Sequence, residues 1–102
     1  MFTIVLWDIE KYQQVKLIEN YAGNEVFLAQ SDQDKYPLLS QLTHCDEELF
    51  SNDELIKLSS EINELKRENV DPEISAYLES VENMIAEAIS THKSILITPF
   101  VD

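Results

Sequence analysis

The chain of 102 residues contains one glycine, one cysteine and only seven lysine and arginine residues. The single glycine excludes phosphate-binding loops of the P-loop and dinucleotide types, because those loops need several glycines at fixed spacing. The single cysteine excludes an internal disulfide and fits a reducing compartment, so we expect a cytoplasmic protein. No apolar run is long enough to span a bilayer and the first residues lack a basic segment, so we expect neither a membrane span nor a signal peptide.

The scarcity of basic residues sets the charge of the protein. Twenty acidic residues against seven basic ones give a formal net charge of −13 at pH 7. Binding to nucleic acid or anionic lipid needs clustered Lys and Arg to neutralise phosphates, so this balance argues against both partners. A basic protein is the partner that such a surface would attract at a raised association rate. The alternative interpretation is that the acidity only maintains solubility.

The second half of the chain is rich in helical periodicity. Ser51 followed by Glu54 has the spacing of a capping box, and Phe50 and Leu55 are placed for a hydrophobic staple. Apolar residues at spacings of three and four predict an amphipathic helix that ends near Arg67. Its apolar stripe consists of Leu55, Leu58, Ile62 and Leu65.

A second amphipathic helix follows after a short link. Asp71 is a suitable N-cap, and Pro72 stands at the first helical position, where proline is favoured. The apolar stripe of this helix is wider and comprises Ile74, Tyr77, Leu78, Val81, Met84, Ile85, Ala88 and Ile89. The short link Glu68–Val70 makes the two helices antiparallel neighbours or lets them meet at a corner.

Two apolar runs rich in β-branched residues predict central strands at Phe2–Trp7 and Ser94–Thr98. Pro99 ends the second of them. The stretch 9–21 fits either a helix or a strand. Its apolar positions scatter around a helical axis instead of forming a stripe, so we predict a strand at Gln14–Glu19.

The middle of the chain, residues 21–48, is predicted to contain a hairpin and its following loops. Tyr21–Asn24 holds the Gly-Asn turn pair, so Glu25–Gln30 is predicted as the partner strand. Tyr36–Leu42 has leucines at helical spacing and predicts a short helical turn. Thr43–Glu48 is predicted as an acidic connection to the first long helix.

This order of strand, strand, strand, helix, helix and strand predicts a single α+β domain over residues 1–102. Two amphipathic helices would cover one face of a small, mainly antiparallel sheet of about four strands. The other face of the sheet would be wet or would be covered by a second copy, so a structural homodimer is one hypothesis for the role of the protein.

Chemistry-bearing residues gather only at Thr43–Glu48, where His44 and Cys45 stand among carboxylates. A zinc site needs ligands at recurring spacing, which this stretch lacks, so we expect no metal and no cofactor. A nucleophilic pair of Cys45 with His92 is formally open, but no orienting residue can be named for it. The expectation is therefore a non-enzymatic protein.

Two sets of residues are candidates for binding. The dense acidic segment is either a solvated face with capping charges or a docking patch for a basic protein. Its members are Asp46, Glu47, Glu48, Asp53 and Glu54. The second set is aromatic and would either sit at the edge of the core or line a small-molecule or catalytic pocket between sheet and helices. Its members are Trp7, Tyr12, Tyr77 and His92.

Three segments together resemble a loose group of small bacterial proteins. They are Tyr36–Ser40, Leu49–Leu65 with its Phe-Ser-Asn-Asp-Glu-Leu start, and the closing Ser94–Phe100. Proteins of this group occur in mobile or accessory gene neighbourhoods such as integron cassettes and toxin–immunity loci. The resemblance implies an immunity-like or accessory role and transfers no functional residue. The chain departs from the group at its end, where Val101-Asp102 stands in place of a Gly-Asp pair.

Overall fold

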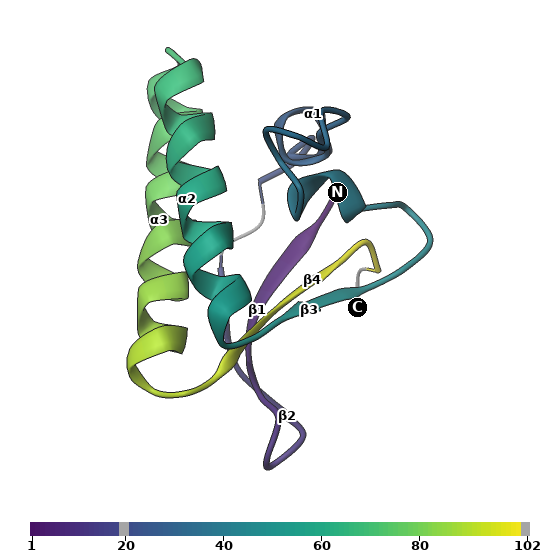
Figure 1. The fold of residues 1–102 in the computed structure, drawn as a ribbon, viewed down its shortest axis with the longest axis vertical. Coiled ribbons are helices and arrows are strands. Elements are labelled where there is room, and N and C mark those ends of the chain that lie inside the picture. Colours follow the sequence, from purple (N-terminus) through teal and green to yellow (C-terminus); the bar gives the residue numbers. More distant parts are fainter. Residues whose placement is uncertain (19–20, 101–102) are drawn as a thin grey trace.

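The computed structural model describes residues 1–18 and 21–100, and the described residues form four strands and two long helices with shorter helical pieces between them (Figure 1). The elements in chain order are β1 (Thr3–Asp8), β2 (Gln13–Leu17), α1 (Glu25–Leu28), the 3₁₀ helix η1 (Leu39–Gln41), β3 (Glu48–Phe50), α2 (Asp53–Glu68), α3 (Pro72–Ser90) and β4 (Ser94–Thr98). The predicted α+β fold with the order β-β-β-α-α-β is confirmed.

The four strands make one antiparallel sheet in the order β2-β1-β4-β3. The two apolar strands β1 and β4 lie at its centre, as their sequences predicted. Ile4 pairs with Ile97 and Leu6 pairs with Ile95, so these four side chains lie on one face. All four are buried in the core that the helices cover.

Helices α2 and α3 lie side by side and pack against that face of the sheet (Figure 1). Their predicted apolar stripes supply most of the helical share of the core, including Leu58, Ile62, Leu78 and Ile85, none of which is exposed. None of the described helices is both long enough and apolar enough to cross a membrane.

The predicted strand Glu25–Gln30 is wrong, because Glu25–Leu28 forms the short helix α1. Gly23, with φ +80°, turns the chain into this helix and leaves Asn24 fully buried. The Asn24 side chain accepts the N–H of Phe2 and donates to the C=O of Phe2, both at 2.7 Å. These two hydrogen bonds fix the start of α1 against the residue that precedes β1, and Glu25–Gln30 does not pair with Gln14–Glu19 as predicted. A run of three apolar residues has no period that separates a helical turn from a strand.

The third strand of the sheet is β3, which lies at the end of the predicted acidic connection and was missed. It pairs with β4 through Leu49 opposite Leu96 and Phe50 opposite Ile95. The predicted helical turn within Tyr36–Leu42 is present as η1, and the predicted strand Gln14–Glu19 is present as β2. Its last predicted residue, Glu19, lies outside the described residues.

The two long helices begin differently from each other. The Asp71 carboxylate accepts the N–H of Glu73 at 2.9 Å, which confirms the predicted cap of α3. The predicted capping box of α2 is wrong: Asn52, with φ 54°, precedes the helix and makes no side-chain cap. The Ser51 hydroxyl instead lies 2.6 Å from the Ser94 hydroxyl of β4. The Ser51 side chain therefore contacts β4 instead of making the predicted capping hydrogen bond with Glu54.

Candidate functional site

Carboxylates along one side of α2 hold the preceding loop in place. Glu61 is 5% exposed, and one of its oxygens accepts the backbone N–H of Leu38 at 3.1 Å and that of Leu39 at 2.9 Å. These N–H groups lie at the start of η1 and would otherwise be buried without an acceptor. Burial raises the pKa of the Glu61 carboxyl, and the two backbone hydrogen bonds oppose that rise.

Glu68 and Glu64 continue this row toward the C-terminal end of α2. Glu68 accepts a hydrogen bond from the Tyr36 hydroxyl and lies 3.0 Å from the Lys35 ammonium, which is also 3.7 Å from Glu64. The Tyr36 hydrogen bond, followed by that of Lys35, lowers the pKa of Glu68. Burial, followed by the Glu68 contact, raises the pKa of Tyr36. Three acidic side chains of α2 are therefore engaged in contacts within the chain.

The basic side chains are also largely engaged within the chain. Five of the seven form ion pairs with carboxylates in the described residues: Lys16 with Glu87, Lys35 with Glu64 and Glu68, Lys66 with Glu82, Arg67 with Glu64, and Lys93 with Asp8. Most of the lysine and arginine side chains therefore neutralise carboxylates within the same chain. The acidic residues without such a partner carry the excess negative charge of the protein.

The predicted acidic segment lies around β3, and we call it the 46–54 patch. Its five members are Asp46, Glu47, Glu48, Asp53 and Glu54. Asp46 and Glu47 are exposed in the loop before β3, and Glu48 is half-buried at the first position of that strand. Asp53 and Glu54 are exposed in the first turn of α2. Among the described residues none of these five carboxylates forms an ion pair or a side-chain hydrogen bond.

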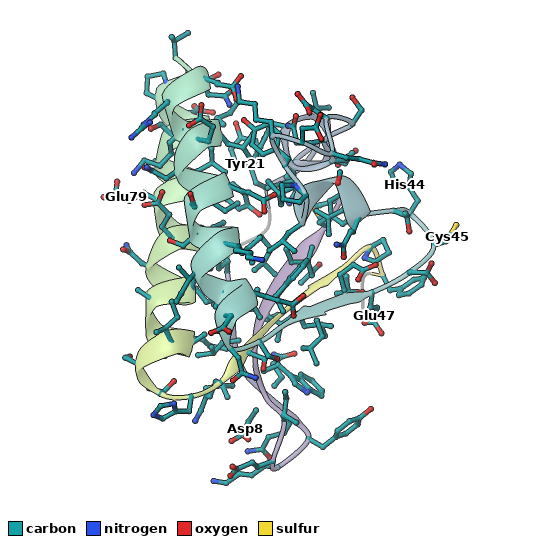
Figure 2. All side chains as sticks on the ribbon, in the orientation of Figure 1. Asp8, Tyr21, His44, Cys45, Glu47 and Glu79 are labelled. Carbon is teal, nitrogen blue, oxygen red and sulfur yellow. The ribbon has the colours of Figure 1, made fainter. Side chains whose placement is uncertain are left out.

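His44 and Cys45 project from the same loop, which lies on the side of the molecule opposite α2 and α3 in the view of Figure 2. The His44 ring stacks on Phe2 with centroids 6.2 Å apart, and Cys45 is exposed. His92 follows α3 and precedes β4, whereas Cys45 lies beyond the opposite end of that strand. A five-residue strand is about 17 Å long, so the hypothetical Cys45–His92 pair is wrong. In the described part of the chain no three His, Cys, Asp or Glu side chains are grouped to hold a metal ion.

An open groove of about 630 Å³ runs between β2 and α3. Its walls are formed by Lys16, Leu17, Ile18 and Tyr21 on one side and by Glu73, Ala76, Tyr77, Ser80, Asn83, Met84 and Glu87 on the other. Of the four predicted pocket aromatics, Tyr77 lines this groove. Trp7 and Tyr12 instead pack edge to face, 5.5 Å apart, on the hairpin of β1 and β2, and His92 lies in the turn after α3. The structure therefore does not bring the four together around this groove.

The sequence analysis considered a pocket between sheet and helices and named Tyr77 for it, but it missed the other residues that line this groove, although α3 carries a pattern that indicates them. Ala76, Ser80, Asn83 and Glu87 recur at spacings of four and three, which places them on one side of the helix. Small and polar residues there leave a trough where a bulky stripe would have closed it. The pattern becomes informative only when β2 is known to run beside that side of α3.

The two ends of the groove differ in charge. At one end the Lys16 ammonium lies 2.6 Å from the Glu87 carboxylate and bridges β2 to α3. At the other end the Tyr21 ring lies 5.2 Å from the Tyr77 ring. Burial, followed by the charges of Asp71 and Glu73, raises the pKa of the Tyr21 hydroxyl. The two tyrosine hydroxyls at this end are therefore uncharged, and the acidic residues Asp71 and Glu73 give it a negative charge.

Comparison with protein-family models, with curated proteins and with solved structures finds no match.

Proposed function

We propose that this protein is a non-enzymatic binding module that recognises a basic protein through the 46–54 patch. The observation that carries the proposal is that the carboxylates fall into two groups, one bound within the chain and one without partners in the described residues. Those of α2 that face the 35–39 loop are engaged within the chain, whereas those of the patch have no intramolecular partner among residues 1–18 and 21–100. An immunity-like or accessory role agrees with this proposal.

Free carboxylates on a chain of net charge −13 accelerate encounter with a positively charged surface. Three members of the patch lie on core-packed elements: Glu48 on the short edge strand β3, and Asp53 and Glu54 in the first turn of α2. Asp46 and Glu47 stand in the loop that leads directly into β3. Because exposed charges are screened by salt, binding through this patch should weaken as ionic strength rises.

The experiment is capture from a lysate of the host cell with the purified chain as bait, at 50 mM and 500 mM salt, read by mass spectrometry. We expect one dominant basic protein that is retained at low salt and lost at high salt. The double variant Asp46→Lys/Glu47→Lys should lose this protein at low salt as well. The matched control Asp34→Lys/Glu79→Lys changes the charge equally at exposed positions outside the patch and should retain it.

Two results would contradict the proposal. One is a captured protein whose retention does not change with salt. The other is a partner that both double variants lose equally, because net charge and not the patch would then explain the binding.

A second candidate, a structural homodimer, is favoured by the outer face of the sheet. Trp7, Leu17, Leu49 and Leu96 surround the buried Val5 on the face of the sheet opposite the helices, where they alternate with the core residues along the strands. Leu17 is 50% and Leu49 43% exposed. Burial of this apolar surface between two copies would favour their association. Sedimentation equilibrium at micromolar concentration tests it: a dimer that Leu49→Lys converts to a monomer supports this candidate, and a monomeric parent chain rejects it.

A further inference from the structure

We propose that the groove between β2 and α3 receives an extended basic peptide segment, which pairs with the free edge of β2 as an added strand. The inference rests on the proposed function, because it names a second contact through which a basic protein would be held. It concerns a surface separate from the 46–54 patch.

The backbone of β2 provides one wall of this site. β2 lies at the edge of the sheet, and all five of its residues are exposed. The Ile18 N–H donates to the C=O of Ile4, so the next residue back, Leu17, has its N–H and C=O directed away from β1. Leu17 lies opposite Val5 at a position where antiparallel strands exchange no backbone hydrogen bonds, so β1 leaves both groups available at this edge. An extended peptide satisfies such groups by adding a strand to the sheet.

The other wall is the small-residue side of α3. β2 and α3 run in opposite directions, since Lys16 meets Glu87 whereas Tyr21, later in the chain, meets Tyr77. The distance along the helix from Glu73 to Glu87 is about 21 Å at 1.5 Å per residue. An extended segment of about six residues covers that length. Alternate side chains of the peptide would enter the trough over Ser80.

The charged residues that line the groove favour a basic peptide over an acidic one. The lysine that lines the groove, Lys16, is already neutralised by Glu87. At the far end Glu73, which makes no ion pair in the described chain, lines the groove together with Tyr21. A carboxylate next to an aromatic face favours a Lys or Arg side chain through ion pairing and cation–π attraction.

The groove's shape argues against other occupants. It is open along its length and borders free backbone groups, which suits a peptide better than an enclosed small molecule. A second copy of this chain would bring its own acidic groove and net charge of −13 to the same place. Like charges would then meet along the added strand.

The probe is a library of random heptapeptides displayed on phage and selected on the full chain at 50 mM salt. We expect enriched peptides with a Lys or Arg near one end and β-branched residues at alternate positions. A synthetic copy of an enriched peptide should bind in solution by fluorescence polarisation. In NMR spectra its resonance shifts should concentrate at Leu17, Ile18 and Ser80, and exchange of the Leu17 amide hydrogen should slow at least tenfold.

Two variants test the walls of the groove. Ser80→Trp fills the trough from an exposed helical position, and Glu73→Lys reverses the charge at the Tyr21 end. Each should weaken peptide binding at least tenfold. Glu79→Lys has the same charge change on the outward side of α3 and should alter binding less than twofold (Figure 2). Circular dichroism of all three variants checks that the helices are retained.

Several outcomes would overturn the inference. They are the absence of enriched peptides, resonance shifts confined to the 46–54 patch, equal weakening by Glu79→Lys, and dimerisation through β2 that the peptide cannot displace. In each case the salt-dependent capture of a basic protein by the 46–54 patch could still hold. Conversely, the peptide could bind in the groove while Asp46→Lys/Glu47→Lys leaves protein capture unchanged. That result would reject the proposed role of the 46–54 patch and support peptide binding by the groove.

Discussion

At the scale of single residues, Glu61 shows how an acidic side chain becomes a structural element. A carboxylate that is 5% exposed loses most of its hydration, which costs several kcal/mol unless hydrogen bonds replace the water. The N–H groups of Leu38 and Leu39 provide that replacement and, in return, gain the acceptor that the start of η1 needs. The loop between α1 and β3 is thereby fastened to α2.

Removing the Glu61 acceptor should destabilise the protein. Glu61→Ala leaves two buried N–H groups without a partner and should lower the free energy of unfolding by about 2–4 kcal/mol. Glu61→Gln keeps one carbonyl oxygen as an acceptor and should cost less than half as much. Urea unfolding followed by circular dichroism measures both. Equal losses in the two variants would show that the hydrogen bonds do not matter.

The raised pKa of Glu61 predicts a pH dependence with a definite sign. The folded chain binds this proton more tightly than the unfolded chain, in which the pKa is near 4.5. The stabilisation that the folded state gains by binding this proton is therefore fully present below pH 4.5. It is lost as the pH rises through the raised pKa of Glu61 in the folded chain. We expect the stability of the parent chain relative to Glu61→Gln to fall between pH 4 and pH 8. A difference that is constant or rises over this range would contradict the assignment.

Asn24 is a second residue whose role depends on distant partners. Its amide joins Phe2 at the start of β1 and donates at 3.0 Å to the Tyr77 hydroxyl of α3. Asn24→Ala should cost about 2–4 kcal/mol of unfolding free energy, because it unpairs buried groups of the backbone. Tyr77→Phe removes only the third hydrogen bond and should cost about 1 kcal/mol. Thermal or urea unfolding of both variants provides the comparison.

At the scale of elements, the two long helices form for the same reason and begin for different reasons. Each has an apolar stripe that the sheet and its neighbour bury. α3 carries its own start in Asp71 and Pro72, which act on their immediate neighbours. α2 begins where β3 ends, and the sheet determines that point by pairing Phe50 with Ile95.

This difference predicts unequal effects of removing the two candidate caps. Asp71→Ala should destabilise the protein by about 1 kcal/mol, because the N–H of Glu73 loses its acceptor. Glu54→Ala should cost less than about 0.5 kcal/mol, since the Glu54 side chain makes no capping hydrogen bond in the structure. Chemical unfolding at pH 7 compares them. If Glu54→Ala lowered the free energy of unfolding as much as Asp71→Ala, the result would indicate that Glu54 does cap α2.

At the scale of the whole molecule, the net charge of −13 acts on both folding and association. The folded chain is compact, with a radius of gyration of 12.6 Å, and confines the excess negative charge within a small volume. Repulsion among these charges opposes the folded state and also keeps copies of the chain apart. Salt screens that repulsion over a distance of about 10 Å at 0.1 M.

We therefore expect thermal stability to rise with salt. Between 0.05 M and 0.5 M sodium chloride the unfolding temperature should increase by several degrees, about 4–8 °C for each kcal/mol of relieved repulsion. The triple variant Asp46→Asn/Glu47→Gln/Glu54→Gln removes three negative charges and should show a smaller increase. Scanning calorimetry provides both values. An unfolding temperature that stays constant or falls with salt would show that the ion pairs outweigh the repulsion.

The sequence by itself determined the parts of this protein that depend on periodicity and on neighbouring residues. The stripes of α2 and α3, the Asp71 cap and the apolar central strands β1 and β4 are such features, because each signal is carried by consecutive residues and burial in a core follows from it. The fold class follows from their order.

The tertiary structure decided the features that depend on residues far apart in the chain. Residues 25–28 are helical because Asn24 is bound to Phe2 and Tyr77, and residues 48–50 are a strand because β4 offers them an edge. Segments of three or four residues are too short to show a period, so a distant partner selects their conformation. The same holds for the acidic side chains: packing separates Glu61, which is buried against backbone N–H groups, from the exposed carboxylates of the 46–54 patch.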